Sequence, residues 1–388
     1  MPHRVAPIVL LVTASTFIAG RSLTPHSPAP LTVHEWGTFT SVAGEDGRAQ
    51  EWLPRQAPGE LPCFVERLPL NVKGYLPGTM RMETPVLYFY APAATAVDVN
   101  VRFRNGVVTE WYPSARVAPS ALDLSAYRQP QFEGSISWSG VTVSPDAAPG
   151  FPTEPGRSHY YRARDTDAAP LRLGSQTEKF LFYRGVGLFP SPIEARVEPS
   201  GQVTVRTSSG GPIGDLLFFA NHDGRIGYRV HHAAGSKLAL DPPTLEDEAD
   251  GPGPELEQLL VAHGLYPKEA AAMVNTWRDA WFEEGTRLFY LMPPAMVDEV
   301  LPLAIRPAPA SIVRAFVGRI ELVTPDAVQK LEAALIAGDA AVLRGYGRFL
   351  QPVADRVLAR LNERQRVPCE QRLSAVFAAS TSAPGSCR

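Results

Sequence analysis

The clearest alternation of hydrophobic and polar residues covers residues 97–104. Three valines and a phenylalanine occupy every second position there, and charged or polar residues occupy the positions between them. This period of two is typical of a β-strand with one buried face. Asn105-Gly106 follows directly, and this dipeptide favours a two-residue hairpin turn because both positions accept positive φ. The pattern predicts a hairpin whose second strand covers residues 107–112.

Short runs rich in β-branched and aromatic residues recur along the first 240 residues, each bounded by turn-forming residues such as Gly, Pro, Asn or Asp. In addition to the hairpin, strands are predicted at 33–42, 85–90, 134–143, 179–186, 193–198, 202–207, 215–220 and 225–231. Many short strands separated by frequent turns are typical of a sandwich. We therefore expect a mainly β protein, with a β-sandwich-like double sheet over residues 31–240.

The period changes after residues 241–254, a segment with four prolines, two glycines and five acidic residues. Such a composition predicts a surface linker. Beyond it the pattern predicts helices 254–265, 267–284, 325–336 and 339–364, and strands 287–292, 301–305 and 312–323. This α+β region, residues 255–367, forms either a domain of its own or strands that join the N-terminal sheets. Residues 368–388 are expected to form a tail.

The N-terminus has the features of a secretory signal peptide, residues 1–22. Its apolar run, 6–19, follows a weakly basic start and is shorter than the ~20 residues that a membrane span needs. Gly20 and Ser22 are small residues two positions apart, which places cleavage after Ser22. The mature chain would begin with a linker at 23–30. We expect an exported protein, periplasmic or extracellular, that does not span the membrane after cleavage; an uncleaved N-terminal anchor is the alternative.

Composition narrows the classes of partner. The 388 residues carry 37 Lys and Arg against 40 Asp and Glu, for a formal net charge of −3. A nucleic-acid-binding protein usually shows a basic excess, so no nucleic-acid partner is expected. The hydrophobic share of 45% is sufficient for a sizeable buried core.

The chain contains three cysteines, Cys63, Cys369 and Cys387. An oxidising compartment would allow one disulfide between two of them, and the third would remain a free thiol. A bond between Cys369 and Cys387 would close the tail, and one between Cys63 and Cys369 would join the N-terminal region to the C-terminal end. The sequence does not choose between these pairings. None of the three lies in a CxxC motif, so a zinc ribbon has no support.

Familiar catalytic and nucleotide-binding motifs are absent. The sequence contains no GxSxG, no HExxH, no strand-linked GxGxxG and no P-loop. Its eight histidines are scattered, and the adjacent His231 and His232 would point to opposite faces of a strand. We therefore predict no metal site and no cofactor, and the motifs do not decide whether the protein is an enzyme.

Glutamate precedes three of the six tryptophans, in Glu35-Trp36, Glu51-Trp52 and Glu110-Trp111. Tryptophan faces stack on sugar rings, and carboxylates accept hydrogen bonds from hydroxyls or perform acid–base chemistry at a glycosidic bond. The alternative is that each tryptophan packs in the core while the adjacent glutamate points to solvent, because side chains alternate along a strand.

Arginine and glutamate recur at spacings that place them on one strand face. Arg81 and Glu83 have the same parity, as do Arg319 and Glu321. Buried pairs of this kind are often structural. The residues that we expect in a pocket or as buried polar groups, with no catalytic role assigned to any, are His34, Glu35, Trp36, Arg81, Glu83, Glu110, Trp111 and Arg184.

The hairpin register makes a specific prediction for Glu110. With Asn105-Gly106 as the turn, Val101 lies opposite Glu110, and directly opposed residues lie on the same sheet face. If the valine face is buried, Glu110 is a carboxylate in a core and must be paired, hydrogen-bonded or protonated. Arg81 and Arg184 are the partners that we expect.

Four segments also resemble a group of uncharacterised exported bacterial proteins that carry a HEWGTFTS motif near the mature N-terminus. They are His34–Ser41 (HEWGTFTS), Met82–Val86 (METPV), Thr109–Pro113 (TEWYP) and Glu178–Gly185 (EKFLFYRG). The resemblance covers most of the mature chain and implies export from a bacterial cell. It implies no activity and no catalytic residue.

The Glu- and Trp-rich segments favour ligand binding, with a carbohydrate or an envelope polymer as the partner. The alternatives are a hydrolase or lyase that uses these carboxylates, and a structural or interaction module of the cell envelope. Two carboxylates about 5–10 Å apart in a cleft would favour hydrolysis. An exposed row of tryptophan faces would favour sugar binding, and burial of these residues with arginine partners would favour a structural role.

We predict that residues 1–22 are removed on export, because the short apolar run ends in small residues. N-terminal sequencing of the exported protein should begin at Leu23. A sequence that begins at Met1 or Pro2 would contradict the prediction.

Overall fold

The computed structural model describes residues 30–55, 61–68, 76–154, 158–247 and 251–379. The predicted signal peptide at 1–22 lies outside this part, as does the linker at 23–30 apart from Pro30. Strands make up 39% and helices 27% of the structure, and most helices lie toward the C-terminus. This confirms a mainly β fold with a C-terminal α+β region. Within the described ranges, every helix is too short or too polar to cross a membrane.

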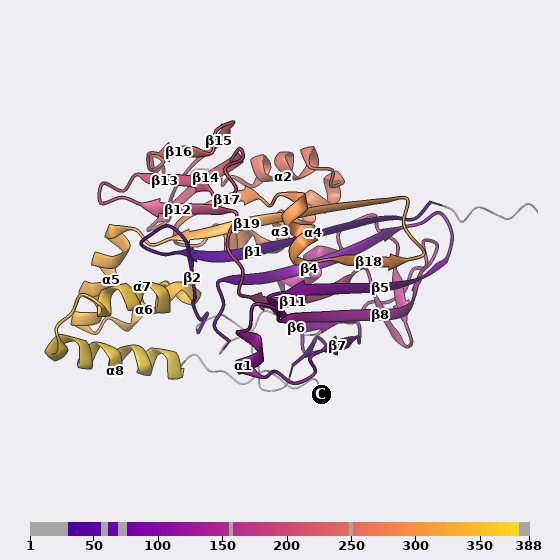
Figure 1. Cartoon of the computed structure of the whole chain (residues 1–388), viewed down its shortest axis with the longest axis horizontal. Coiled ribbons are helices and arrows are strands. Elements are labelled where there is room, and N and C mark those ends of the chain that lie inside the picture. The colour runs from indigo at the N-terminus through magenta and orange to yellow at the C-terminus, as the bar shows by residue number, and fades with distance from the viewer. Residues whose placement is uncertain (1–29, 56–60, 69–75, 155–157, 248–250, 380–388) are drawn as a thin grey trace, which may run out of the picture.

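A ten-stranded sheet forms the centre of the protein (Figure 1). In spatial order its strands are β15 (Arg225–Ala233), β14 (Gly214–His222), β17 (Gly285–Leu291), β19 (Ser311–Leu322), β1 (Thr32–Ala43), β4 (Met80–Tyr90), β11 (Leu181–Gly187), β6 (Gly106–Tyr112) and β3 (Glu66–Arg67), with β2 (Ala49–Gln50) beside β1. The neighbours β1 and β19 are parallel, and the other paired strands of this sheet are antiparallel.

A six-stranded sheet packs on one face of the central sheet, which gives the predicted sandwich. Its strands are β10 (Gln176–Glu178), β9 (Leu171–Leu173), β8 (Glu133–Val143), β5 (Thr95–Arg104) and β18 (Leu303–Arg306), with β7 (Arg116–Ala118) beside β8. A third, small sheet consists of β12 (Ile193–Val197), β13 (Val203–Thr207) and β16 (Lys237–Leu240). The valines of β5 pack in the sandwich core, as their alternation predicts.

Helices cover the other face of the central sheet and one end of the molecule (Figure 1). The covering helices are α2 (Gly253–Ala262) and α3 (Pro267–Trp281), and the terminal group comprises α5 (Pro325–Ala337), α6 (Ala340–Gly345), η3 (Gly347–Phe349), α7 (Leu350–Leu358) and α8 (Glu363–Ala379). Shorter elements are α1 (Leu124–Tyr127), η2 (His159–Arg164) and α4 (Pro294–Val300). Strand β1 therefore has no solvent-facing side: Phe39 packs toward the second sheet and Trp36 toward the helices.

Helix α3 shows why this cover forms. It begins at Pro267, a residue suited to the first helical turn, and the Glu269 carboxylate accepts a hydrogen bond from the Tyr266 backbone N–H at 2.9 Å. Val274, Trp277 and Trp281 recur at three- and four-residue spacing and are at most 3% exposed. This spacing in the sequence predicts a stripe that faces the core, and the burial of the three side chains confirms it.

The C-terminal region does not form a separate sheet. Strands β17 and β19 lie between β14 and β1 in the central sheet, and β18 joins the second sheet. Of the two arrangements that the sequence left open, the structure has the one in which these strands complete the N-terminal sheets. The helix predicted at 339–364 is divided into α6, η3 and α7, and α8 continues to Ala379 inside the segment predicted as a tail.

The predicted hairpin of residues 97–112 is wrong. Asn105 has the positive φ of 51° that the turn requires, but β5 pairs with β8 and β18 while β6 pairs with β11 in the other sheet. The chain crosses between the sheets at Asn105, whose N–H donates to the Phe132 carbonyl and whose carbonyl accepts from the Leu188 N–H. Long-range hydrogen bonds have replaced the local pairing that the turn signal favours.

The bonding of the cysteines differs from both pairings that the sequence suggested. Cys63 is in a disulfide, and Cys369 is free and buried. Pairings that use Cys369 are therefore wrong, and Cys387 lies outside the described residues.

We predict that Trp277→Ala lowers the free energy of unfolding by about 3–5 kcal/mol, because it leaves a large cavity between α3 and the central sheet. Denaturant unfolding measures this loss. Val261→Ala, at a position that is 40% exposed, is the control and should change the stability by no more than about 0.5 kcal/mol. An unchanged stability of the Trp277 variant would contradict the core assignment.

Candidate functional site

Charged side chains gather between the central sheet and the helices, and we call this group the arginine–glutamate layer. Strands β4, β6, β11, β17 and β19 supply most of it, and η3 and the residues after α3 supply the rest. Its members are Arg81, Glu83, Glu110, Arg184, Glu283, Arg287, Arg319, Glu321 and Arg348. All but Glu283 are at most 8% exposed. Burial of this many charges requires partners within the protein.

Strand register explains how residues distant in sequence reach this layer. Thr40 of β1 lies beside Arg81 on one side and Arg319 on the other, and Thr38 lies beside Glu83. Directly opposed residues share a sheet face, so these side chains form a continuous row across β4, β1 and β19. The equal parity of Arg81 and Glu83, noted in the sequence, places both in this row.

The backbone is irregular along the same row. The register shifts between β1 and β4, between β4 and β11, and between β11 and β6. Thr84 in β4 has a φ of 48°, which is unusual for a β-branched residue. Its hydroxyl accepts a hydrogen bond from Arg184 Nη2 at 3.2 Å. Bulges and strained residues concentrate at functional sites, so this row is where we place the candidate site.

Glu110 is buried, as predicted, but on the other face of its strand. A register shift in β6 leaves Val108 in the sandwich core and places Glu110 opposite Arg184, whose guanidinium lies against α3. Trp111 packs with the valines instead. Burial lowers the pKa of Arg81 to about 10, and the nearby Glu83 and Glu110 charges oppose that shift. Both expected arginine partners are thus neighbours of Glu110.

Arg348 joins the terminal helices to the sheet. Its Nη1 donates to both oxygens of Glu83, at 2.9 and 3.2 Å, and the Thr40 hydroxyl donates to Glu83 Oε2 at 3.0 Å. Its Nε donates to Glu283 Oε1 at 3.4 Å. The adjacent Phe349 ring stacks on Trp52 at 5.3 Å. No sequence pattern marked Arg348, which lies in the 3₁₀ turn η3 that interrupts the helix predicted at 339–364.

Arg319 is the least satisfied member of the layer. It is 0% exposed, and its Nη2 donates to Glu283 Oε1 at 2.9 Å and to Glu321 Oε2 at 3.4 Å. Its Nε and Nη1 are buried and have no acceptor in the described part of the chain. Burial lowers the pKa of Arg319 to about 10. Arg287, by contrast, donates hydrogen bonds from all three of its guanidinium nitrogens. Their acceptors are the Glu321 carboxylate and three backbone carbonyls.

Other buried donors lie near Arg319. The indole nitrogens of Trp277 and Trp281 and the Thr38 hydroxyl also have no hydrogen-bond partner within the described residues. The Trp281 ring lies 5.6 Å from Phe289, which is the register partner of Arg319 on β17. Buried donors without acceptors are rare in proteins, and water or a bound ligand usually explains them.

The remaining sequence candidates lie elsewhere. Glu35 faces the sandwich interior, where it accepts from Arg314 Nε at 2.6 Å and from the Tyr183 hydroxyl at short range. His34 and Trp36 face the helices but lie toward the other end of β1, where His34 Nδ1 is 2.6 Å from Glu269 Oε2. The structure therefore brings together Arg81, Glu83, Glu110 and Arg184, and it separates Glu35, Trp111, His34 and Trp36 from them.

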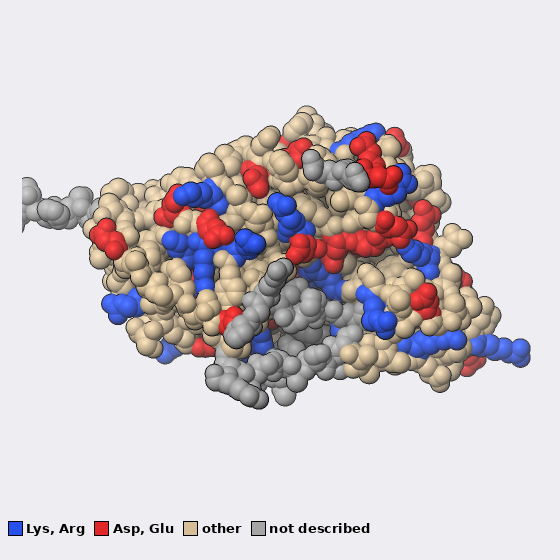
Figure 2. Space-filling model, turned by 180° about the vertical axis from the view of Figure 1, so that it is seen from behind, with Lys and Arg blue, Asp and Glu red and all other residues tan. Residues whose placement is uncertain are grey.

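The outer surface differs from this layer. On the face opposite to that of Figure 1, acidic and basic side chains are interspersed, with a row of acidic ones near the middle (Figure 2). No group of three or more His, Cys, Asp or Glu side chains in the described ranges is arranged to hold a metal ion.

Comparisons with known proteins add little. No family model and no curated protein matches the chain. Among solved structures, the yeast delta-COP-I mu-homology domain is similar over 76% of this chain and 95% of its own, with 10% identity and a TM-score of 0.26. The same domain complexed with the Dsl1 WxWxV peptide covers 76% and 96%, with 9% identity and a TM-score of 0.28. Similarity this low carries no argument about fold or function.

Glu283 should make the stability depend on pH. Burial alone would raise the pKa of its carboxyl, but Arg348, Arg319 and Arg287 lower it below its ordinary value. A carboxylate with a lowered folded-state pKa stabilises the fold above its unfolded-state pKa, and this contribution is lost as the pH falls through the folded-state pKa. We predict that Glu283→Gln costs about 1–3 kcal/mol at pH 7 and progressively less in acid.

Denaturant unfolding of both proteins from pH 7 down to the acid transition measures this difference. Glu299→Gln, at an exposed position, is the matched control and should change the stability by no more than about 0.5 kcal/mol at any pH. A constant cost of Glu283→Gln across the pH range would contradict the assigned charge pairing.

Proposed function

We propose that this chain is an exported ligand-binding protein that recognises an anionic group at the arginine–glutamate layer. The observation that carries the proposal is Arg319, a fully buried arginine with two donors, Nε and Nη1, that no described residue accepts. A buried cation is costly unless it is paired and hydrogen-bonded. A bound anion would supply the missing acceptors.

The charge balance of the layer supports an anionic ligand. Its described members are five arginines and four glutamates. Glu283 is shared by Arg319 and Arg348, and Glu321 is shared by Arg287 and Arg319, so no carboxylate belongs to Arg319 alone. One negative charge beside Arg319 would balance the group.

Sugar recognition through stacked tryptophans has less support. All six tryptophans are at most 8% exposed, so none offers a free face to a sugar ring. The carbohydrate or envelope polymer expected from the sequence would have to be recognised through an acidic group rather than through aromatic stacking.

The hydrolase alternative has less support than ligand binding. Hydrolysis of a glycosidic bond needs two carboxyl groups that flank the bond, one of them able to give up a proton. Glu83 accepts from Arg348 and Thr40, and Glu35 lies on the opposite face of the sheet. A purely structural role explains the paired residues but leaves the Arg319 donors unexplained.

Titration calorimetry of the purified full chain with acetate and with its neutral isostere acetamide, at constant ionic strength, tests the proposal. Acetate should bind and acetamide should not. Arg319→Met should weaken acetate binding at least tenfold, because charge-assisted hydrogen bonds of about 1.5–3 kcal/mol are lost.

Arg314→Met is the matched control for that experiment. Arg314 is also buried and has one donor, Nη2, without an acceptor among the described residues, but it pairs with Glu35 on the opposite face of the sheet. The variant should therefore lose stability and keep acetate affinity. Equal behaviour of acetate and acetamide, or acetate binding that survives Arg319→Met in a folded protein, would refute the proposal.

A further inference from the structure

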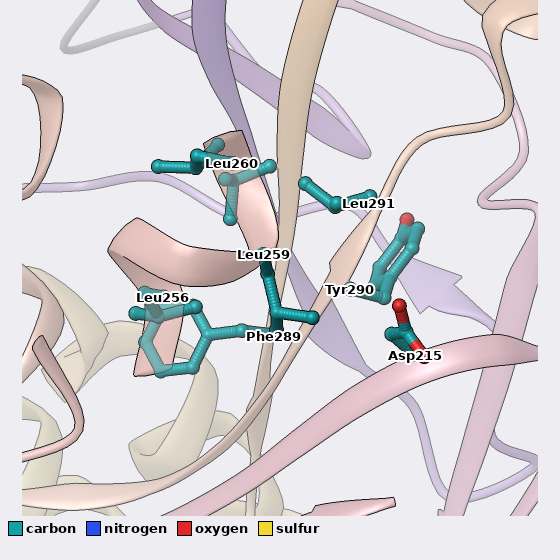
Figure 3. A pocket seen from close by; sticks show the side chains of 8 residues that line it. Asp215, Leu256, Leu259, Leu260, Phe289, Tyr290 and Leu291 are labelled. Atoms are coloured by element: carbon teal, nitrogen blue, oxygen red, sulfur yellow. The ribbon is translucent and has the colours of Figure 1, made fainter. Parts of the chain in front are cut away.

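The hollow between α2 and the central sheet is too small for a ligand of several atoms. Leucines of α2 and residues of β14, β17 and β19 line it (Figure 3). Its enclosed part has room for about one water molecule. A polymer reaches a folded protein at its outer surface, so an exposed sheet face is the better place for one.

The outer face of the six-stranded second sheet is such a surface. Strands β18, β5 and β8 lie side by side in Figure 1, and their inward residues fill the sandwich core. The alternate residues point away from that core. Five exposed arginines occupy outward positions: Arg102 and Arg104 of β5, Arg116 of β7, Arg172 of β9 and Arg306 of β18.

Short polar side chains form the floor between these arginines. Ser137 of β8 lies opposite Asn100 of β5 on one side and Arg116 of β7 on the other. Ser135 lies opposite Arg102, and the Asn100 side-chain amide donates to Ser137 Oγ at 3.2 Å. Directly opposed residues share a face, so long arginine side chains border a floor of hydroxyl and amide groups. Such groups can both donate to and accept from the hydroxyls of a sugar.

This face is positively charged, although the whole chain has a formal net charge of −3. At exposed outward positions of the described strands, the five arginines are accompanied by two acidic residues, Asp98 and Glu133. Asp98 Oδ1 accepts from the Gly140 N–H at 2.7 Å. The Glu133 carboxylate is 3.7 Å from Arg102 Nη1 and 3.8 Å from Arg104 Nε. Such long contacts between exposed side chains are weak, so the two arginines can exchange Glu133 for a ligand.

The arginines are spread along the face rather than gathered at one point. Asp98, the register partner of Arg306, and Arg104 are six residues apart on β5, which is about 20 Å. A small anion would contact only part of this distance, whereas a chain with a carboxylate on each repeat would contact several arginines at once. The planar guanidinium also matches a carboxylate in a bidentate arrangement.

The same face lacks the aromatic side chains on which single-stranded nucleic acids stack their bases. In β5 and β8 as described, the aromatic residues are Phe103 and Trp138, and both point into the sandwich core. The positive charge therefore comes with hydroxyl and amide groups, which favours a sugar polymer over a nucleic acid.

We propose that the outer face of the second sheet binds an acidic polysaccharide, a polyuronate whose carboxylates pair with the arginines. Its sugar hydroxyls bond to Ser135, Ser137 and Asn100. Arg319 lies on the helix-covered face of the central sheet, so this surface is separate from the anion site proposed there. The two sites can therefore be tested independently.

Calorimetric titration of the full chain with decamers of galacturonate and of their methyl ester tests the proposal. The acid should bind, the uncharged ester should not, and added salt should weaken the binding. The double variant Arg102→Gln/Arg116→Gln should weaken binding of the acid about tenfold, because two ion pairs with the polymer are lost. Both positions are exposed, so the variant should keep the melting temperature and the acetate affinity of the unsubstituted chain.

Arg360→Gln/Arg366→Gln is the matched control. It removes the same two charges from exposed positions beside α7 and in α8, and it should leave the affinity for the decamer unchanged. An equal loss in the control, or equal binding of acid and ester, would overturn the assignment of this face. Tighter binding of single-stranded DNA with the same number of charges would overturn the choice of partner. Failure of the decamer to bind while acetate still binds would remove this inference and leave the anion site in place.

Discussion

Coverage of both faces of the central sheet is the constraint on which the rest of this structure depends. A sandwich partner covers one face and helices cover the other, so successive residues of β1, such as Glu35 and Trp36, are both buried. In a sheet with one face exposed to solvent, every second residue of a strand would reach water, and polar residues could occupy those positions. Here each charged residue on a central strand has to find its partner inside the protein.

Two solutions to that requirement occur on opposite faces of β1. Toward the sandwich, Glu35 is paired with Arg314 and Tyr183, and its carboxylate is fully used. Toward the helices, carboxylates are shared among several arginines, and Arg319 keeps two unaccepted donors. In the first, both carboxylate oxygens have a donor and one arginine nitrogen, Arg314 Nη2, lacks an acceptor among the described residues. The second leaves two nitrogens of one arginine without acceptors, and it coincides with the irregular backbone at Thr84.

The sequence predicts individual elements of this fold better than their partners. Alternation identified β5 and its buried valines, and helical spacing identified the Trp277 face of α3, because both signals are local. The turn signal at Asn105-Gly106 gave the correct backbone conformation but the wrong pairing, since pairing is decided by long-range contacts. Burial of Glu110 was predictable, but its face was not, because the register shift in β6 has no sequence signature.

For the candidate site, as for the fold, the sequence predicted local features but not the contacts between distant segments. Equal parity placed Arg81 beside Glu83, and the apolar surroundings of Arg184 made it a reasonable partner for Glu110. Arg348 reaches Glu83 across 265 positions of sequence from a 3₁₀ turn, and no periodicity could have linked them. Sites assembled from distant strands and loops depend on tertiary contacts that local patterns do not encode.

The parallel pairing of β1 with β19 also determines when this chain can fold. Thr32 pairs with Ser311, so β1 acquires its parallel neighbour only after the 279 positions that separate these two residues have been synthesised. Until then β1 presents an apolar, unpaired edge, and contacts this distant in sequence make folding slow. A nascent chain that folds late exposes the edge of β1 for longer, and an exposed edge of this kind favours aggregation until the C-terminal strands arrive.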